Sequence, residues 1–289
     1  MHVARREPGE TTGHDLAGRI ERALTDILER AAGTGTPPRL REALAYAVFP
    51  GGARLRPRLC LAVAAACGDA RLDTATASAA AVELVHCASL VHDDMPCFDG
   101  ADLRRGRETV HVRYGEPIAL LVGDALIVIA FEAIARAGGV EALGLLALAT
   151  GPSRGIIAGQ AWESEPLAPL DEYHRAKTAA LFEAAAGIGA LAAGADPRPW
   201  RPFGEAIGRA YQAADDLLDA VAASSTTGKT GQRDAALGRP SVVRAYGVEA
   251  ARARVRTHLE DARARLPACP APRTVHGWLD RLEERLGQA

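Results

Sequence analysis

Hydrophobic residues recur at intervals of three and four positions along most of this chain from Asp15 onward. Segments with this spacing are interrupted by proline or glycine, and strict alternation of apolar and polar residues is hard to find. A period of about 3.6 residues is typical of amphipathic helices, whereas alternation is typical of strands. The pattern therefore predicts an all-α fold. The predicted helices span residues 15–32, 38–47, 57–67, 74–92, 116–137, 140–163, 171–193, 201–222, 240–266 and 272–287.

Two of these helices, 74–92 and 171–193, are apolar around most of their circumference. Such helices need neighbours on every side and are expected deep inside a bundle. No repeat or linker-like segment divides the chain, so we expect a single domain over residues 13–289. Residues 1–12 are polar and are predicted to form a flexible arm, and residues 96–114 are predicted to be a loop.

Composition supports a helical protein and excludes several partners. The chain is 48% hydrophobic but only 4% aromatic, so alanine, leucine and valine supply most of the buried surface. A net charge of -2 argues against binding to nucleic acid or an anionic membrane surface. The five cysteines lack CxxC spacing and are interpreted as core residues in a reducing compartment. With no signal-peptide segment and no apolar run of about 18 residues, we expect a cytoplasmic protein without membrane insertion.

An acidic cluster follows the apolar helix 74–92. It contains Asp93, Asp94, Asp99 and Asp102, and Arg104 and Arg105 come directly afterwards. An adjacent pair of carboxylates at a helix C-terminus faces both the helix dipole and mutual repulsion, at a cost of about 1 kcal/mol or more. A bound divalent cation removes that cost, and oxygen ligands without histidine or cysteine favour magnesium. A solvated acidic helix end is the alternative.

A second acidic cluster lies inside the predicted helix 201–222. Asp215 and Asp219 are four residues apart and therefore share a face, with Asp216 beside them. A buried helix does not carry three carboxylates unless cations or basic groups oppose them. The two clusters together are suited to hold magnesium and diphosphate between them, whereas the alternative is two unrelated surface patches.

Basic residues near glycine, proline and threonine suit the binding of phosphate groups. Arginine binds phosphate oxygens through two nitrogens, and lysine acts as a point charge. Each one alone is more often a solvated surface charge, but their spacing around the acidic clusters suits two diphosphates. These candidates are Arg54, Arg56, Arg104, Arg105, Lys177, Lys229 and Arg239.

Taken together, these stretches resemble the trans-prenyltransferase (polyprenyl synthetase) family from about Tyr46 to Gly247. Within the family, the residues around Ala88 to Leu90, Met95 to Cys97 and Gly159 to Glu165 look most like bacterial geranylgeranyl diphosphate synthases of carotenoid pathways. The ordered motifs that carry the family resemblance are Gly51–Pro57, Asp93–Arg105, Gly159–Gln160, Lys177–Thr178 and Gln212–Asp219.

The resemblance implies an isoprenoid-synthase-type helical bundle around a deep central cavity, assembled as a homodimer, with three magnesium ions as cofactors. The magnesium ligands it implies are Asp93, Asp94, Asp99, Asp215, Asp216 and Asp219. The residues implied for the allylic diphosphate are Arg104, Lys177, Thr178, Gln212, Lys229 and Arg239. Those implied for isopentenyl diphosphate are Gly52, Arg56, His86 and Arg105. The catalytic set is Asp93, Asp94, Lys177 and Asp215.

The implied activity is the head-to-tail condensation of isopentenyl diphosphate with an allylic diphosphate.

Three positions depart from the family pattern. Ala53 stands where most members have a lysine that contacts isopentenyl diphosphate, so either that affinity is weaker or Arg54 compensates. Glu163 replaces an aspartate, and Arg239 with Pro240 replaces a lysine-containing segment, but both keep the sign of the charge.

Chain length in this family depends on an apolar tunnel along the helix that carries Asp93. Ala88 and Ser89, just over one turn before Asp93, are small, whereas farnesyl-producing relatives tend to carry a bulky aromatic residue there. Val85 lies about one turn deeper and suits a floor near a C20 product. Geranylgeranyl diphosphate is therefore the expected product, and an aromatic residue at position 88 is expected to shift it toward farnesyl diphosphate.

Other functions remain open from the sequence. The product alternatives are farnesyl diphosphate and longer prenyl diphosphates. A non-catalytic partner subunit is disfavoured because both acidic clusters are intact. A terpene cyclase is disfavoured because it does not need the Gly51–Pro57 and Arg104–Arg105 elements that serve a second diphosphate.

Overall fold

The computed structural model describes residues 13–68, 72–225 and 240–287, so the predicted arm 1–12 and the candidates Lys229 and Arg239 lie outside the described residues. Its elements are α1 (Gly13–Ala31), α2 (Pro38–Val48), α3 (Leu55–Cys67), α4 (Leu72–Asp93), β1 (Leu103–Arg104), β2 (Arg107–Glu108), α5 (Val110–Tyr114), α6 (Glu116–Arg136), α7 (Val140–Thr150), α8 (Ile156–Trp162), α9 (Leu170–His174), the π-helical turn η1 (Arg175–Ala179), α10 (Ala180–Ala192), α11 (Trp200–Ser225), α13 (Val242–Tyr246), α14 (Val248–Ala264) and α15 (Pro272–Leu286). The all-α prediction is confirmed.

Three predicted segments differ from the structure. The predicted helix 140–163 is wrong because the chain turns between α7 and α8, where Gly151 and Pro152 interrupt the apolar pattern. The predicted helix 240–266 is divided at Gly247, whose φ of 85° lies in the left-handed region. The predicted loop 96–114 contains the short antiparallel hairpin β1–β2 and the single-turn helix α5.

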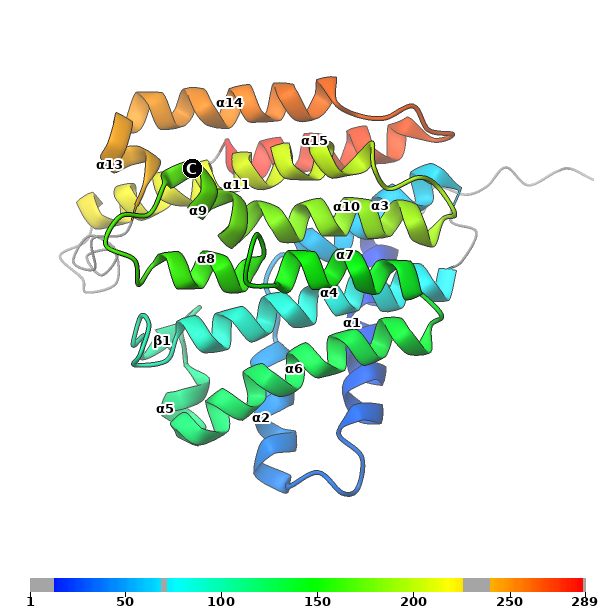
Figure 1. The fold of residues 1–289 in the computed structure, drawn as a ribbon, viewed down its shortest axis with the longest axis vertical. Helices are drawn as coiled ribbons and strands as arrows, with labels where there is room; N and C mark the ends of the chain where they lie inside the picture. Colours follow the sequence, from blue (N-terminus) through cyan, green and yellow to red (C-terminus); the bar gives the residue numbers. More distant parts are fainter. Residues whose placement is uncertain (1–12, 69–71, 226–239, 288–289) are drawn as a thin grey trace, which may run out of the picture.

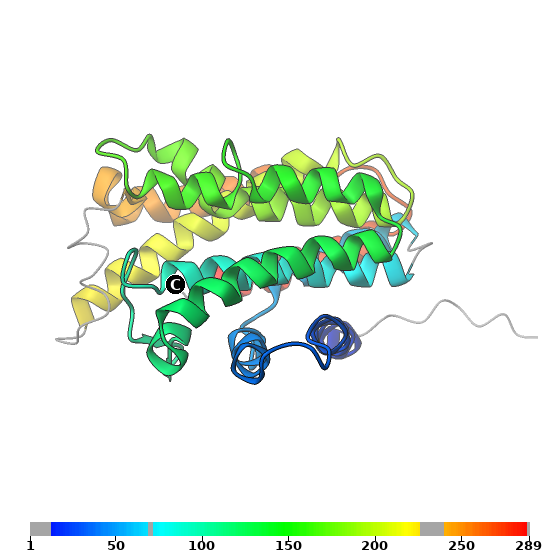
Figure 2. The ribbon, with the colours of Figure 1, turned by 60° about the horizontal axis from the view of Figure 1, so that its bottom comes forward.

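The helices form layers around α4 (Figures 1 and 2). α4 packs against α6, α3 and α10, while α11 packs against α10 and α14. Figure 2 shows α1 and α2 nearly end-on beneath the layer that contains α4 and α6, with α7, α8 and α10 on the opposite side. The hairpin and the ends of α4 and α8 gather at one end of the bundle. This arrangement brings both acidic clusters to that end.

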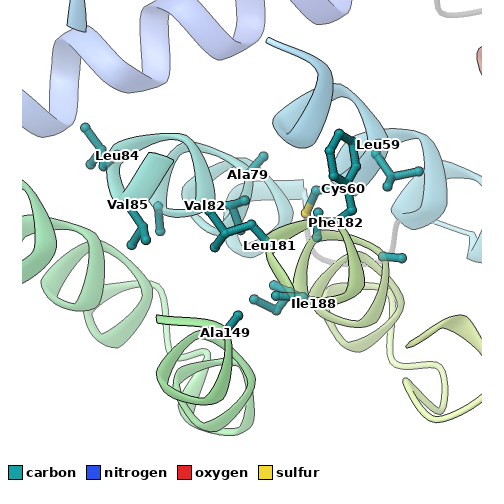
Figure 3. Packing of buried hydrophobic residues seen from close by; sticks show 14 of the residues in the cluster. Leu59, Cys60, Ala79, Val82, Leu84, Val85, Ala149, Leu181, Phe182 and Ile188 are labelled. Carbon is teal, nitrogen blue, oxygen red and sulfur yellow. The ribbon is translucent and has the colours of Figure 1, made fainter. Parts of the chain in front are cut away.

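The core lies where α3, α4 and α10 meet (Figure 3). Val82 of α4 lies beside Leu181 of α10, and both of these side chains and Ile188 of α10 are buried. The predicted burial of helices 74–92 and 171–193 is confirmed, since most residues of α4 and α10 are inaccessible. The five cysteines are free, and only Cys60 and Cys87 are buried, whereas Cys97 is exposed.

Within the part of the chain that the structure describes, two helices are long and apolar enough to span a membrane by length and composition alone. The most apolar 18-residue window is 72% buried in α4 but only 44% buried in α6. α4 is therefore a core helix of the bundle. α6 leaves one apolar face outward, where Leu120, Leu121 and Val128 are exposed.

Candidate active site

A cavity of about 680 Å³ opens at the end of the bundle that carries the hairpin. Its wall is built by α3, α4, α8, α9, η1, α11, α13 and α15 together with residues near the hairpin. The structure therefore brings together motifs that are far apart in the sequence. The sequence-predicted residues in this wall are Gly52, Arg56, His86, Ser89, Asp93, Arg104, Arg105, Lys177, Thr178, Gln212, Asp215, Asp216 and Asp219.

Asp93 is the last residue of α4 and is held toward the cavity by α8. Gln160 donates a hydrogen bond from Nε2 to Asp93 Oδ1 over 2.9 Å and another to the carbonyl of Ser89 over 3.1 Å. A Cβ on the preceding Gly159 would lie 2.4 Å from the Lys177 Cα, so only glycine allows α8 to approach η1 this closely. The Gly159–Gln160 pair thus fixes the orientation of Asp93 relative to Lys177.

Asp94 has different surroundings from its neighbour Asp93. Both of its carboxylate oxygens accept from Arg104 Nε at 2.9 Å, and Arg104 Nη2 lies 2.8 Å from Oδ1. Burial raises the pKa of Asp94, and the pairing with Arg104 only partly opposes that rise. Asp94 lines a smaller neighbouring cavity instead of the main one, and Asp99 lines neither. Asp94 therefore orients Arg104.

The second acidic cluster is divided in the same way. Asp215, Asp216 and Asp219 all line the cavity, but Asp215 and Asp219 are exposed whereas Asp216 is buried. Asp216 accepts a hydrogen bond from Gln212 Nε2 over 2.8 Å and one from the backbone N–H of Val242 over 2.6 Å. Asp216 thus connects α11 to the first residue of α13.

The donor set of the cavity fits magnesium. Asp93 approaches from α4, and Asp215 and Asp219 approach from α11. Within the described residues no three carboxylate, histidine or cysteine side chains converge on one point. Hard oxygen donors that do not form a closed cage suit a cation whose coordination is completed by water and substrate phosphates, as is usual for magnesium.

Two consecutive glycines make room for two arginines. A Cβ on Gly51 would lie 1.9 Å from the guanidinium carbon of Arg54, and a Cβ on Gly52 would lie 2.5 Å from Arg105 Nη2. Arg105 lines the cavity across Gly52, but Arg54 lines only the neighbouring cavity. The glycine pair, in the segment that leads into α3, therefore leaves room for Arg54 next to Gly51 and for Arg105 next to Gly52.

Arg54 is a structural residue and does not reach the main cavity. It adopts a left-handed conformation with φ of 51°, and its guanidinium forms ion pairs with Glu21 and Glu83 at 2.8 Å. It also donates to the carbonyl of Val48. Of the two alternatives for Ala53, these partners and the position of Arg54 outside the main cavity favour a weaker affinity over compensation by Arg54.

Arg56 and His86 form the part of the wall around Gly52, where Arg56 carries the positive charge. The Arg56 guanidinium is buried 4.6 Å from the centre of the Phe182 ring. Burial lowers the pKa of Arg56, and burial together with nearby arginines lowers the pKa of His86 well below its usual value. Arg56 Nε and His86 Nδ1 are buried and lack a hydrogen-bond partner among the described residues. Such groups are costly unless a ligand pairs with them, which indicates an anion site.

Lys177 and Thr178 lie in the π-helical turn η1. π-Turns inside helices are frequent at functional sites. Lys177 Nζ forms an ion pair with Glu163, and Thr178 Oγ1 donates a hydrogen bond to Gln212 Oε1. Burial alone would lower the pKa of Lys177, but Tyr173, Asp93 and Glu163 together raise it, so the side chain stays charged.

A second, more apolar cavity of about 510 Å³ adjoins the main one. Ser89 lines both cavities, and Val85, Ile127 and Ile156 contribute apolar side chains to the second. Ala88 lines neither of them and is completely buried. The structure thus places Ser89 and Val85, but not Ala88, along the path that continues from the main cavity.

Comparison with known proteins assigns the chain to a family. The family model for polyprenyl synthetases matches residues 37–271. The chain belongs to the polyprenyl synthetase family. Geranylgeranyl diphosphate synthases from Cereibacter sphaeroides and Rhodobacter capsulatus are 49% and 47% identical to it, over 93% and 88% of this chain and 95% and 90% of theirs.

Solved structures of the same fold support this assignment. A geranyltransferase from Helicobacter pylori, complexed with magnesium and isoprenyl diphosphate, superposes with a TM-score of 0.81 at 29% identity, covering 96% of this chain and 100% of that one. A geranyltranstransferase from Thermotoga maritima superposes with a TM-score of 0.79 at 26% identity, covering 96% of this chain and 100% of that one. The predicted isoprenoid-synthase-type bundle is confirmed.

The wall of this polyprenyl synthetase cavity also contains residues that the sequence did not identify. Tyr173, Tyr211 and Arg285 line it, and Arg285 comes from the C-terminal helix α15. Tyr173 precedes Lys177 by four residues, so helical spacing could have identified it. No local signal connects α15 with the motifs, because its packing against α3 is a property of the whole bundle.

The contact between Gly52 and Arg105 gives a specific prediction. Gly52→Ala is expected to displace the Arg105 guanidinium and to raise the KM for isopentenyl diphosphate about tenfold, with little change in the KM for the allylic substrate. Steady-state rates with each substrate varied in turn measure both values. Gly35→Ala is the matched control, because a Cβ there meets no atom within 4 Å. A rise confined to the allylic KM would contradict the prediction.

Proposed function

We propose that this chain is a magnesium-dependent geranylgeranyl diphosphate synthase, which condenses isopentenyl diphosphate with an allylic diphosphate. The observation that carries the proposal is one cavity with two separate cationic regions and acidic residues from two helices. Lys177 lies in the first region, and the second contains the charged Arg56 and Arg105 with the uncharged imidazole of His86 beside them. The relatives named geranylgeranyl diphosphate synthase at 49% and 47% identity favour this activity within the family.

A cavity that holds two diphosphates apart can bring their hydrocarbon parts together for condensation. The C1–O bond of the allylic substrate breaks, and diphosphate leaves with the electron pair. The double bond of isopentenyl diphosphate then attacks the allylic C1, and a proton from its C2 passes to the released diphosphate. The products are a chain longer by five carbons and inorganic diphosphate. Apolar walls such as Ile156 and Leu90 exclude water from the cation.

The substrates are assigned to the two regions by the groups that line them. Arg104, which is oriented by Asp94, and Lys177 in η1 hold the allylic diphosphate, with Thr178 and Gln212 beside them. Buried nitrogens without partners suit the diphosphate of the second substrate, and Arg56 and His86 supply them. The two substrates thus meet between α4 and α11, where the reacting carbons can be held in line.

Asp93, Asp215 and Asp219 would hold three magnesium ions together with the diphosphate, with Asp94, Asp99 and Asp216 in support. When bound, magnesium neutralises the charge that accumulates on the departing diphosphate. The magnesium in the complex of the Helicobacter pylori geranyltransferase supports magnesium as the metal.

Two rival functions make different predictions. A non-catalytic partner subunit would not elongate any substrate alone. A terpene cyclase would convert an allylic diphosphate without isopentenyl diphosphate, and it has no use for the second cationic region around Arg56 and His86. The second region therefore favours a synthase.

The test is incorporation of radiolabelled isopentenyl diphosphate by the purified chain with magnesium and each of the C5, C10 and C15 allylic starters. The expected result is labelled C20 alcohol after phosphatase treatment. Release of a hydrocarbon from the allylic substrate alone would favour the cyclase, and no turnover without a second protein would favour the partner subunit.

We further propose that the chain acts in the cytoplasm and assembles as a homodimer, and the outward face of α6 supports the dimer. Leu120, Leu121 and Val128 of that face are about half exposed or more. Large exposed apolar patches are typical of interaction surfaces. Light scattering of the purified chain measures the mass, and Leu121→Glu with Val128→Glu is expected to give monomers.

Ala53 allows a gain-of-function prediction. Because Arg54 is held by Glu21 and Glu83, the second cationic region lacks the lysine that most members of the family carry. Ala53→Lys is expected to lower the KM for isopentenyl diphosphate about three- to tenfold through a charge-assisted hydrogen bond. Ala53→Met adds length without charge and is the control. Equal KM values for the two variants would contradict the prediction.

A further inference from the structure

Tyr173 lies between two charged side chains at the allylic side of the cavity. Its hydroxyl donates a hydrogen bond to Glu163 Oε1 over 2.8 Å, and Lys177 Nζ donates to that hydroxyl over 3.3 Å. Lys177 also forms an ion pair with the same oxygen of Glu163. One carboxylate oxygen therefore receives both a phenolic hydroxyl and an ammonium group.

The three groups come from successive elements and are well shielded from solvent. Glu163 caps the C-terminus of α8, Tyr173 lies in α9, and Lys177 lies in η1. The side chains of Glu163 and Lys177 are 5% and 22% exposed, and Tyr173 is 3% exposed. Burial raises the pKa of Tyr173, so its hydroxyl keeps its proton and remains a donor. Interactions in such a setting are costly to break without replacement.

An arriving allylic diphosphate has to compete with Glu163 for the ammonium group of Lys177. If Lys177 turns toward the diphosphate, the Oε1 atom of Glu163 loses one of its two donors. The Tyr173 hydroxyl remains on that oxygen and keeps it hydrogen-bonded. Without the hydroxyl, the carboxylate would retain the ammonium group more strongly, and the diphosphate would bind less well.

We propose that Tyr173 is a positioning residue that makes Lys177 available to the allylic diphosphate by sharing Glu163 with it. This role rests on the proposed function of the cavity. Tyr173 acts through Lys177 and does not itself take part in bond making or breaking. The proposal therefore concerns the affinity for one of the two substrates.

Tyr173→Phe tests the role directly. The KM for geranyl diphosphate is expected to rise about three- to tenfold, whereas the KM for isopentenyl diphosphate stays within about twofold of its original value. Tyr114→Phe is the matched control, because Tyr114 is also buried and donates to a glutamate, Glu42, over 2.9 Å but lies outside the main cavity. It is expected to change neither KM. A parallel rise of both KM values in Tyr173→Phe would overturn the proposal.

A second substitution separates positioning from packing. In the double variant Tyr173→Phe with Glu163→Gln, the amide carries no charge to retain Lys177, so the KM for geranyl diphosphate should return to within about twofold of the original. A packing defect at position 173 would not be relieved by a change at position 163. Persistence of the raised KM in the double variant, with an unfolding midpoint like that of the single variant, would overturn the proposal.

Binding of inorganic diphosphate with Mg²⁺, measured by calorimetry, gives a readout that does not depend on turnover. Its Kd is expected to rise about three- to tenfold in Tyr173→Phe. An unchanged Kd would overturn the role of Tyr173. A chain that binds diphosphate as expected but never incorporates isopentenyl diphosphate would instead overturn the proposed function.

Discussion

Replacement of Asp93 or Asp215 by asparagine is expected to reduce kcat at least about a hundredfold while leaving the chain folded. Both side chains line the cavity, one at the end of α4 and one in α11. Each substitution removes a negative charge proposed to hold magnesium at the departing diphosphate, and lost electrostatic stabilisation of this kind costs two to three powers of ten. Asparagine is similar in size and can still accept from Gln160 at position 93. Product formation at saturating substrates measures the loss.

The neighbouring carboxylates provide controls for that result. Asp102 belongs to the same acidic cluster but is exposed and outside the cavity wall, so Asp102→Asn should keep nearly full activity. Asp94→Asn removes the partner of Arg104 and should raise the KM for the allylic substrate more than it lowers kcat. Full activity of Asp93→Asn or Asp215→Asn, or of the unaltered chain in excess chelator, would contradict the assignment.

The acidic clusters could be located from the sequence because they conflict with their surroundings. Adjacent aspartates at the end of an apolar helix, and again inside one, are unfavourable unless something opposes their charge. The sequence could not show that the two aspartates of each adjacent pair have different contacts. In the structure Asp94 binds Arg104 outside the main cavity, whereas Asp93 lines it; Asp215 and Asp216 both line it, but Asp216 is buried and binds the start of α13. That division depends on contacts with segments distant in the chain.

The sequence also could not show in which direction each basic side chain points. Arg54 and Arg56 are two residues apart in one glycine-rich motif, and composition gives no reason to separate them. The left-handed backbone at Arg54 directs its guanidinium to Glu21 and Glu83, whereas Arg56 reaches the cavity. The pairing partner Glu21 lies in α1, so the distinction required the packing of α1 against α3.

The spacing of apolar residues predicted the bounds of helices well where one helix runs without a break. It failed where a short turn separates two apolar helices. Helices 74–92 and 116–137 agree with α4 and α6 to within a few residues. The predicted helix 140–163 concealed a turn, because the apolar residues on both sides of Gly151 and Pro152 continue the same pattern. That turn matters for function, since it sets the start of α8 and hence the position of Gln160.

Product length should respond to position 89 and not to position 88. Successive residues of a helix point about 100° apart, and in α4 Ser89 lines both cavities whereas Ala88 lines neither. Ser89 lies where the main cavity meets the second, more apolar one. Ala88 lies one turn before His92, whose ring occupies the space beside Gly123 of α6. His92 and Val85 line the second cavity, but Ala88 between them is completely buried and lines neither cavity.

Ser89→Phe is accordingly expected to shift the main product from C20 to C15. A growing chain that passes from the main cavity into the second has to pass Ser89, which lies about one helical turn, roughly 5.4 Å, below Asp93. That depth corresponds to about one isoprene unit, so a phenyl ring there stops the chain one unit earlier. Val85, a further turn down, is also in the wall, and Val85→Ala should allow products longer than C20.

Ala88→Phe is the informative counterpart, because the sequence alone predicts that it shortens the product. In the structure this side chain is completely buried and lines neither cavity, so the added ring should overpack the core around α4 and cost about 1–3 kcal/mol of stability. The expected variant melts at a lower temperature and still makes C20. Chromatography of the dephosphorylated products, with thermal unfolding of each variant, separates the two positions. A C15 product from Ala88→Phe together with C20 from Ser89→Phe would show that the elongation path follows the opposite face of α4.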